Sequence, residues 1–430
     1  MSTVQLVGGI LAVRLTRFEH VGGLLGDLDV PLAAVVSSVA VPDGLRAARG
    51  LRAPGLALPG RVKVGTWRGR AGRSYVTVRR GPALRLRLRG FRYDTVLVST
   101  PDAERLAAAV RPSKPGPDAE PIAPGTREVT FTSGPLTLVG TLTVPARQPR
   151  GAVLLLAGSG PIDRDGNHRR LRLDIQAQLA RALDDAGYAT LRYDRRGVGA
   201  SDGEFLRAGL RDNLDDAKAA LAALRAETGL EPRRTFLVGH SEGALLAASV
   251  AAAEHDLGGL VLLSCPARTG EQTLRWQAER IPATLPPAVR ALLRLLRVDL
   301  AAKVRKNHAK LRATTTPVAR VGGVSVNALW FREFLDYDPR PDLARTTAPV
   351  LAVTGSKDLQ TPPEDVVAIA SAAAGPVETV VVDDVSHILR SQSGALTLRS
   401  YRKDVRRPVD QRLVQLVLRW LDQRTDARNP

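Results

Sequence analysis

Cysteine is almost absent from this chain, which has a single one, Cys265, in 430 residues. One thiol cannot form an internal disulfide, so no such cross-link contributes to stability. Because Cys265 follows the apolar run at residues 260–263, we interpret it as a small buried hydrophobic residue and not as a catalytic thiol.

Long apolar runs are also missing. No stretch of 18 or more apolar residues occurs, which argues against a transmembrane helix. Residues 1–11 have no basic residue before their short apolar stretch and no small-residue cleavage site after it, which argues against a secretory signal. We therefore expect a cytoplasmic protein. Its length predicts two or three domains, and 44% hydrophobic residues suffice for a sizeable core.

Acidic residues are too few to balance the basic ones, and the formal net charge is +19. The excess is concentrated in two stretches: residues 1–120 hold 19 Lys and Arg against 9 Asp and Glu, and residues 266–340 hold 14 against 6. Zinc-ligand spacing, basic-aromatic RNA motifs and basic heptads are all lacking, so we do not expect nucleic acid as a partner. Two interpretations stay open: a compositional bias toward arginine, or binding of an anionic membrane surface or a protein through the basic N-terminal region.

The proline- and glycine-rich stretch at 111–124 predicts an interdomain linker. Before it, residues 1–110 show short alternating runs and a helical segment at 101–110, which predict a small antiparallel sheet closed by one helix. In residues 84–89 leucine and arginine alternate strictly, so Arg85, Arg87 and Arg89 should share one face, which is either solvated or anion-binding. In its order of elements this domain weakly resembles bacterial pleckstrin-homology-like domains, which would imply a docking or scaffolding role.

After the linker, strands alternate with helices over residues 125–425, which predicts a doubly wound, mostly parallel α/β sheet. The expected strands are an opening hairpin at 128–132 and 138–144, followed by 152–156, 189–193, 235–238, 259–263, 350–354 and 377–382. The expected helices are 174–186, 213–228, 244–253 and 409–421. Between about 266 and 338 the alternation gives way to a basic, proline-interrupted helical region, which we interpret as a lid. Ligands of such sheets bind at the carboxyl ends of the strands.

One such strand end carries the pentapeptide Gly-His-Ser-Glu-Gly at 239–243, between an apolar strand and a helix of small residues. A serine in a sharp turn of this kind projects its hydroxyl above the sheet, and the flanking glycines let the helix pack closely. Ser241 is therefore the candidate nucleophile.

A serine hydroxyl needs a histidine base, and the histidine needs a carboxylate that orients it. His387 and Asp358 each follow an apolar strand, and the order Ser241, Asp358, His387 is the one expected for such a sheet. Asp383 and Asp384 are rival acids, which would need a tight local turn to reach the imidazole. Asp358 is therefore preferred.

Residues 123–425 resemble the α/β-hydrolase superfamily, in its serine aminopeptidase-like and acyl-esterase branch. The resemblance rests on the pentapeptide and on the segments at 158–167, 193–202, 355–358 and 386–387. It implies a catalytic triad of the three residues above and an oxyanion hole made by the backbone N–H groups of Ser159 and Glu242, with Gly160 as the alternative to Ser159.

The resemblance implies a serine esterase that acts on a small-molecule ester through an acyl-enzyme and needs no cofactor. A peptidase or aminopeptidase is the alternative within enzymes, and a membrane-surface or protein-binding module with an inactive hydrolase scaffold is the alternative outside them. Residues 163–167 resemble the start of a calcium loop, but the rest of that pattern is missing and we expect no metal. We expect their side chains to tie this loop to Arg195 or Arg196 instead.

Overall fold

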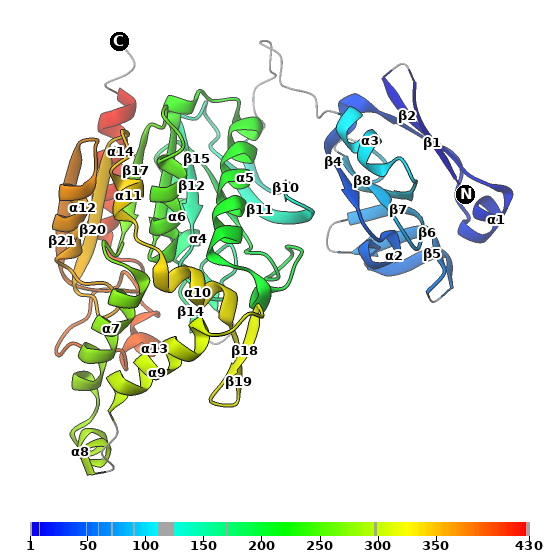
Figure 1. Cartoon of the computed structure of the whole chain (residues 1–430). Coiled ribbons are helices and arrows are strands. Elements are labelled where there is room, and N and C mark those ends of the chain that lie inside the picture. Colours follow the sequence, from blue (N-terminus) through cyan, green and yellow to red (C-terminus); the bar gives the residue numbers. More distant parts are fainter. Residues whose placement is uncertain are drawn as a thin grey trace. The chain divides into compact units, whose positions relative to one another are not determined.

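Figure 1 shows the computed structural model of the chain, which describes residues 2–7, 9–48, 50–58, 60–69, 72–88, 91–110, 124–168, 171–295 and 299–426. The chain divides into two compact units, Met1–Asp118 and Ala119–Pro430. Of the predicted linker, residues 111–123 lie outside the described residues. In the described part of the chain, no helix is long and apolar enough to cross a bilayer.

The N-terminal unit contains two sheets. The smaller is antiparallel, with strands β1 (Thr3–Val7), β2 (Ile10–Arg14) and β3 (Leu28–Pro31). The larger has the order β4-β8-β9-β7-β6-β5, with strands at Val35–Val41, Ala83–Leu88, Thr95–Ser99, Gly72–Arg79, Val62–Gly69 and Leu51–Leu58. Its helices are α1 (Arg17–Gly23), α2 (Gly44–Ala47) and α3 (Ala103–Ala109).

The mainly antiparallel character predicted for this unit is confirmed, with one parallel pair, β7 and β9. In β8 the alternation works as expected: Leu84, Leu86 and Leu88 are buried, whereas Arg85 and Arg87 are half-buried. Arg89 lies outside the described residues. Strands β3, β4, β5 and β9 and helices α1 and α2 were not predicted. The pleckstrin-homology-like resemblance and a partner for the basic surface stay predictions.

The C-terminal unit is built on one sheet of eight strands in the order β10-β11-β15-β12-β16-β17-β20-β21, which confirms the predicted fold class. β10 and β11 are antiparallel, as are β11 and β15, and all the remaining pairs are parallel. Their bounds are β10 Gly125–Ser133, β11 Leu136–Val144, β15 Tyr188–Tyr193, β12 Gly151–Leu156, β16 Thr235–His240, β17 Gly259–Leu263, β20 Val350–Lys357 and β21 Val377–Ser386.

Helices cover both faces of this sheet, as its nearly continuous apolar strands require. On one face of the sheet, a hydrophobic core includes α5 (Leu210–Thr228), α6 (Glu242–Ala251) and α12 (Asp365–Ala372). α4 (Ile175–Asp185) and α14 (Gln411–Asp426) share a second core with the other. The parallel register pairs Leu156 with Gly239 and His240 with Leu263, so the carboxyl ends of β12, β16 and β17 meet at one edge.

An insertion separates β17 from β20 and contains most of the helices drawn in yellow-green and yellow in Figure 1. Its elements are α7 (Gly270–Arg280), α8 (Pro287–Leu295), α9 (Leu300–Arg312), β18 (Val318–Val321), β19 (Val324–Asn327) and α10 (Ala328–Asp336). α7, α9 and α10 pack on one another. The β18–β19 hairpin corrects the expectation of an all-helical region: Gly322 and Gly323 both have positive φ, 60° and 82°, as a two-residue hairpin turn requires.

Shorter helices complete the unit: the four-residue α11 (Arg340–Leu343) and α13 (Tyr401–Asp404), and 3-10 turns at Phe205–Arg207, Pro232–Arg234 and Ile281–Thr284. Two-residue strands β13 (Asn167–His168) and β14 (Leu171–Arg172) pair within the loop that follows β12. This loop lies at the carboxyl edge of the sheet, where the sequence places the candidate site.

Candidate active site

Ser241 lies in the sharp turn between β16 and α6, with φ 57° and ψ −119°. A non-glycine residue rarely adopts this strained conformation, which persists only where the surroundings enforce it. Here they do: a Cβ on Gly239 would lie 2.2 Å from the carbonyl oxygen of Gly243, and one on Gly243 would lie 2.1 Å from that of Leu156. The two glycines of the pentapeptide are thus required by the close approach of α6 to β16 and β12.

His387 and Asp358 lie just past the carboxyl ends of β21 and β20, and they are hydrogen-bonded to each other. The imidazole Nδ1 lies 2.8 Å from Oδ2 of Asp358 and 3.0 Å from Oδ1. Both side chains are buried, with 7% and 0% of their surface exposed. Oδ1 of Asp358 also accepts the backbone N–H groups of Gln360 and Thr361, at 2.7 and 2.8 Å. The carboxylate is therefore held from two directions.

The charge of Asp358 is stabilised by these contacts. Burial acts to raise the pKa of this carboxyl, but the nearby charge of His387 and the hydrogen bonds from its ring and from the backbone outweigh burial. The pKa of Asp358 therefore lies below its usual value, and the group stays ionised beside the imidazole. The rival acids lie elsewhere: Asp383 is exposed, and Asp384 pairs with Lys357 at 2.7 Å.

A pocket of about 150 Å³ brings Ser241 and His387 together with the loop that follows β12. Seven of its fourteen lining residues have polar side chains, the others are aliphatic residues or glycines, and none of its described lining residues is acidic. The lining residues are Gly158, Ser159, Ile162, Gly166, Leu171, Leu173, Ile175, Gln176, His240, Ser241, Gln360, His387, Ile388 and Tyr401.

The two positions predicted for oxyanion donors flank Ser241. Glu242 is the first residue of α6, so its N–H has no acceptor within the helix. On the other side, Gly158 approaches so closely that a Cβ there would lie 3.5 Å from the Ser241 Cβ. Ser159, the next residue, is exposed and lines the pocket. Backbone at 158–159 thus lies against the nucleophile.

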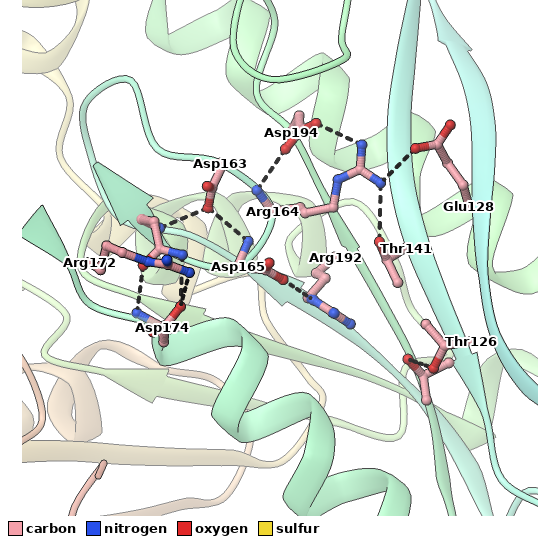
Figure 2. Close-up of polar contacts among 12 residues, drawn as sticks. Thr126, Glu128, Thr141, Asp163, Arg164, Asp165, Arg172, Asp174, Arg192 and Asp194 are labelled. Carbon is pink, nitrogen blue, oxygen red and sulfur yellow. Dashed lines mark hydrogen bonds and ion pairs between the residues drawn. The ribbon is translucent and has the colours of Figure 1, made fainter. Parts of the chain in front are cut away.

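Figure 2 shows how the loop that follows β12 is anchored to the sheet. Asp163 accepts the backbone N–H groups of Asp165 and Asn167, at 3.0 and 2.9 Å, which closes the loop on itself. Arg164 donates to Asp194 at 2.7 Å, and Arg192 donates to Asp165 at 2.8 Å. The carboxylates of Asp163 and Asp165 in this loop thus accept hydrogen bonds from the protein. Among the described residues, no group of three or more His, Cys, Asp or Glu side chains is placed to hold a metal ion.

The arginines that tie this loop differ from those expected. Asp165 pairs with Arg192, whereas Arg196 pairs with Asp216 on α5 at 2.6 Å. Arg195 donates to the carbonyl of Ala157 at the start of the loop, at 2.9 Å. The reason is strand alternation. Leu191 faces the core that β15 shares with α5 and α6, so Arg192, the next residue, faces the side of the sheet that α4 covers.

Several residues of the site were not found from sequence. Gln176, Gln360 and Tyr401 line the pocket from segments with no motif of their own. His240 is buried beneath the nucleophile turn, and its Nε2 lies 2.8 Å from the carbonyl oxygen of His387. Burial, followed by the nearby charge of His387, lowers the pKa of His240 to about 3, so this ring is neutral and donates that hydrogen bond.

Comparison with known proteins identifies the family. A family model described as serine aminopeptidase, S33, matches residues 173–390, half of the chain. The protein belongs to this α/β-hydrolase family. Esterase EstD of Thermotoga maritima is 26% identical over 288 residues, which cover 66% of this chain and 65% of that protein. An uncharacterized protein of Mycobacterium tuberculosis is 28% identical over 232 residues, or 54% of this chain and 64% of its own length.

The chain thus spans somewhat less than two thirds of the length of each of these relatives. Among solved structures, proline iminopeptidase of Mycobacterium smegmatis aligns with a TM-score of 0.49 and 18% identity, over 70% of this chain and all of that one. Est1E of Butyrivibrio proteoclasticus, solved with ferulic acid bound, aligns with a TM-score of 0.46 and 18% identity. The alignment covers 69% of this chain and 98% of that one.

Proposed function

We propose that this protein is a serine esterase that cleaves carboxylic esters through a Ser241–His387–Asp358 triad. The observation that carries the proposal is that His387, hydrogen-bonded to the buried Asp358, lines the same pocket as a serine held in a strained turn. A conformation of that cost is retained where it serves a function. An imidazole whose Nδ1 is held by a carboxylate presents Nε2 as the base.

The reaction follows from these positions. Ser241 Oγ attacks the carbonyl carbon of the ester while Nε2 of His387 takes its proton, and the ionised Asp358 stabilises the imidazolium that forms. The backbone N–H groups of Ser159 and Glu242 donate to the oxyanion of the tetrahedral intermediate. The imidazolium then protonates the leaving alkoxide as the intermediate collapses. Water, deprotonated by the same ring, attacks the acyl-enzyme carbonyl, and the ring returns that proton to Ser241 Oγ as the acid leaves.

The pocket indicates a small acyl group. A protein cavity of about 150 Å³ holds one benzene molecule, so a pocket of similar volume accommodates about six non-hydrogen atoms. The apolar side chains of Ile162, Leu173 and Ile388 in its wall favour an alkyl or aryl chain over a charged one. We therefore propose esters of short acyl chains as substrates.

An aminopeptidase is the alternative that the family description raises, and the site gives it less support. A free amino terminus is an ammonium ion, which needs an acidic side chain in the pocket. None of the described lining residues is acidic. Glu242, beside the nucleophile, has its carboxylate engaged by Arg195, Asn213 and Trp330 and so is not offered to a substrate.

The test compares the protein with its Ser241→Ala variant, using a fluorophosphonate probe and p-nitrophenyl esters of increasing chain length. We expect labelling and cleavage in the wild type, highest for acetate to hexanoate, and loss of both in the variant. Cleavage of aminoacyl-p-nitroanilides in preference to esters would instead support the peptidase. A folded wild type that is neither labelled nor active would contradict the proposal and favour a binding module with an inactive scaffold.

A further inference from the structure

The carboxylate of Glu242 has no role in the reaction proposed above, although its backbone N–H has one. The side chain is 2% exposed and accepts three hydrogen bonds. Arg195 Nη1 and Asn213 Nδ2 donate to Oε1 at 2.7 and 3.0 Å, and Trp330 Nε1 donates to Oε2 at 3.0 Å. The donors come from three separate segments: the loop that follows β15, helix α5, and helix α10 of the insertion.

Arg195 connects this carboxylate to the other side of the nucleophile. Its side chain is 6% exposed, and Nη2 donates to the carbonyl oxygen of Ala157 at 2.9 Å. The peptide plane that contains this carbonyl continues into Gly158, which lines the same pocket as Ser241. By fixing the orientation of that plane, the guanidinium constrains the next peptide, which carries the N–H of Ser159.

Trp330 connects the same carboxylate to the insertion. Its ring stacks on Phe334, with centroids 4.6 Å apart and an interplanar angle of 10°. The start of α10 is anchored by Asn327, whose amide donates to the carbonyls of Phe205 and Ala208 at 2.9 and 2.7 Å. The indole N–H is thus presented to Glu242 by a helix that is fixed at its first turn.

We propose that the Glu242 side chain is a positioning residue: together with Arg195 it holds both oxyanion donors in place, and Trp330 makes their position depend on the docking of α10. The inference rests on the proposed function of Ser241. A buried carboxylate must keep its donors or move toward new ones, so the loss of one donor displaces the residue at the start of α6. Oxyanion donors act on the transition state, so such a displacement should lower kcat more than it changes KM.

The first experiment is Glu242→Gln, which keeps the shape of the side chain and removes its charge. We expect kcat to fall by about 10- to 100-fold, with KM changed by less than about threefold. The inhibition constant of an alkylboronic acid, which forms a tetrahedral adduct on the serine, should rise by a similar factor. A merely structural role would lower the melting temperature and leave the ratio between the boronic acid constant and KM unchanged.

The second experiment compares two tryptophans of the insertion. Trp330→Phe keeps a ring for the stack on Phe334 and removes the donor to Glu242; we expect kcat to fall by about 3- to 10-fold. Trp276→Phe is the matched control, because Trp276 lies on α7 and its buried Nε1 has no hydrogen-bond partner among the described residues. We expect its kcat to stay within about twofold of the wild type. In the double variant, Trp330→Phe should add little to Glu242→Gln, since both break the same unit.

The outcomes separate this inference from the function on which it rests. An active wild type whose Glu242→Gln and Trp330→Phe variants keep their kcat and boronic acid constants would overturn the positioning role and leave the esterase standing. If Glu242→Gln does not fold, Trp330→Phe against Trp276→Phe decides alone. A wild type that neither cleaves esters nor reacts with the fluorophosphonate would overturn both.

Discussion

The two edges of the eight-stranded sheet each have a cavity, and the larger of the two is not the one at which the candidate catalytic residues lie. At the amino edge, the residues that precede β12, β16, β17 and β20 line a cavity of about 940 Å³, whereas the pocket at the carboxyl edge has about 150 Å³. The larger cavity holds the side chains of Arg150, Arg233, Arg234, Asp256 and Arg424, among others. Of the candidate catalytic residues, Ser241 and His387 line the smaller one, and Asp358 is buried behind His387, to which it is hydrogen-bonded.

What distinguishes the carboxyl edge is the burial of its charges. At the amino edge, Arg233 and Asp256 pair while 72% and 60% exposed. Such a pair contributes between zero and about 1 kcal/mol, because water screens it. At the carboxyl edge, His387 and Asp358 are 7% and 0% exposed. Buried charges are costly unless each has well-placed partners. A retained buried charge therefore indicates a catalytic site better than the volume of a cavity does.

The largest effect that the comparison predicts is at Asp358. Asp358→Asn should lower kcat by about 10³- to 10⁴-fold, because the amide no longer holds the imidazole in the tautomer that exposes its basic nitrogen. Steady-state ester hydrolysis measures it, with folding checked by circular dichroism. Asp384→Asn is the matched control, since that exposed carboxylate pairs with Lys357, and its kcat should stay within about twofold. Equal losses in the two variants would remove the distinction between buried and exposed charge.

A smaller effect is expected where the pocket wall limits the acyl chain. Leu173→Ala removes part of that wall, so the ratio of kcat/KM for octanoate to that for butyrate should rise by about tenfold, which corresponds to about two more methylene groups buried at about 0.8 kcal/mol each. The ratio is its own control, because a general loss of activity lowers both terms. An unchanged ratio would mean that the acyl chain lies elsewhere.

Buried charge also predicts a pH dependence of stability. The pKa of His240 is about 3 in the folded protein, against an ordinary value of 6.5. Between these two values His240 binds a proton in the unfolded chain and stays neutral in the folded one. The free energy of unfolding should therefore fall with pH between 6.5 and 3, by up to about 1.4 kcal/mol per pH unit from this group. Above pH 6.5 the group has no such effect.

Urea denaturation of His240→Gln at pH 7, 6, 5 and 4 measures this contribution. Gln keeps a donor for the carbonyl of His387 and cannot titrate, so the variant should lose less stability than the wild type on acidification. The free energy of unfolding of the variant minus that of the wild type should therefore increase from pH 7 to pH 4, whatever its value at pH 7. Parallel curves would show that His240 titrates normally.

The smallest effect is predicted at the amino edge. Arg234 donates to the carbonyls of Pro149 and Arg150 at 2.7 Å each, and so joins the starts of β12 and β16. Arg234→Gln should reduce the free energy of unfolding by about 1–2 kcal/mol and leave kcat unchanged. A clear loss of kcat at matched folding would mean that the two edges are coupled, contrary to the comparison.

Much of the fold could be predicted because its signals are local. The strands and helices around the pentapeptide follow from apolar runs, small-residue helices and glycine punctuation, which depend on neighbours in sequence. The β18–β19 hairpin carried a local signal of its own, the Gly322–Gly323 pair between two valine-containing runs, and was missed because the whole region was interpreted as helical. Strand β5 was not predicted, because Pro54 and Gly55 argue against a strand in the sequence. Pairing with β6 stabilises it in the structure.

By itself the sequence determined the α/β class, the glycines that the turn at Ser241 requires, and the chain order of the three candidate catalytic residues. Only the tertiary structure decided that Asp358 and not Asp384 meets His387, that Arg195 joins Glu242 to Ala157, and how small the pocket is. The physical reason is separation along the chain. Periodicity and turn chemistry act between neighbouring residues, whereas these contacts join residues 29 to 47 positions apart, and the packing of the sheet and its loops brings them together.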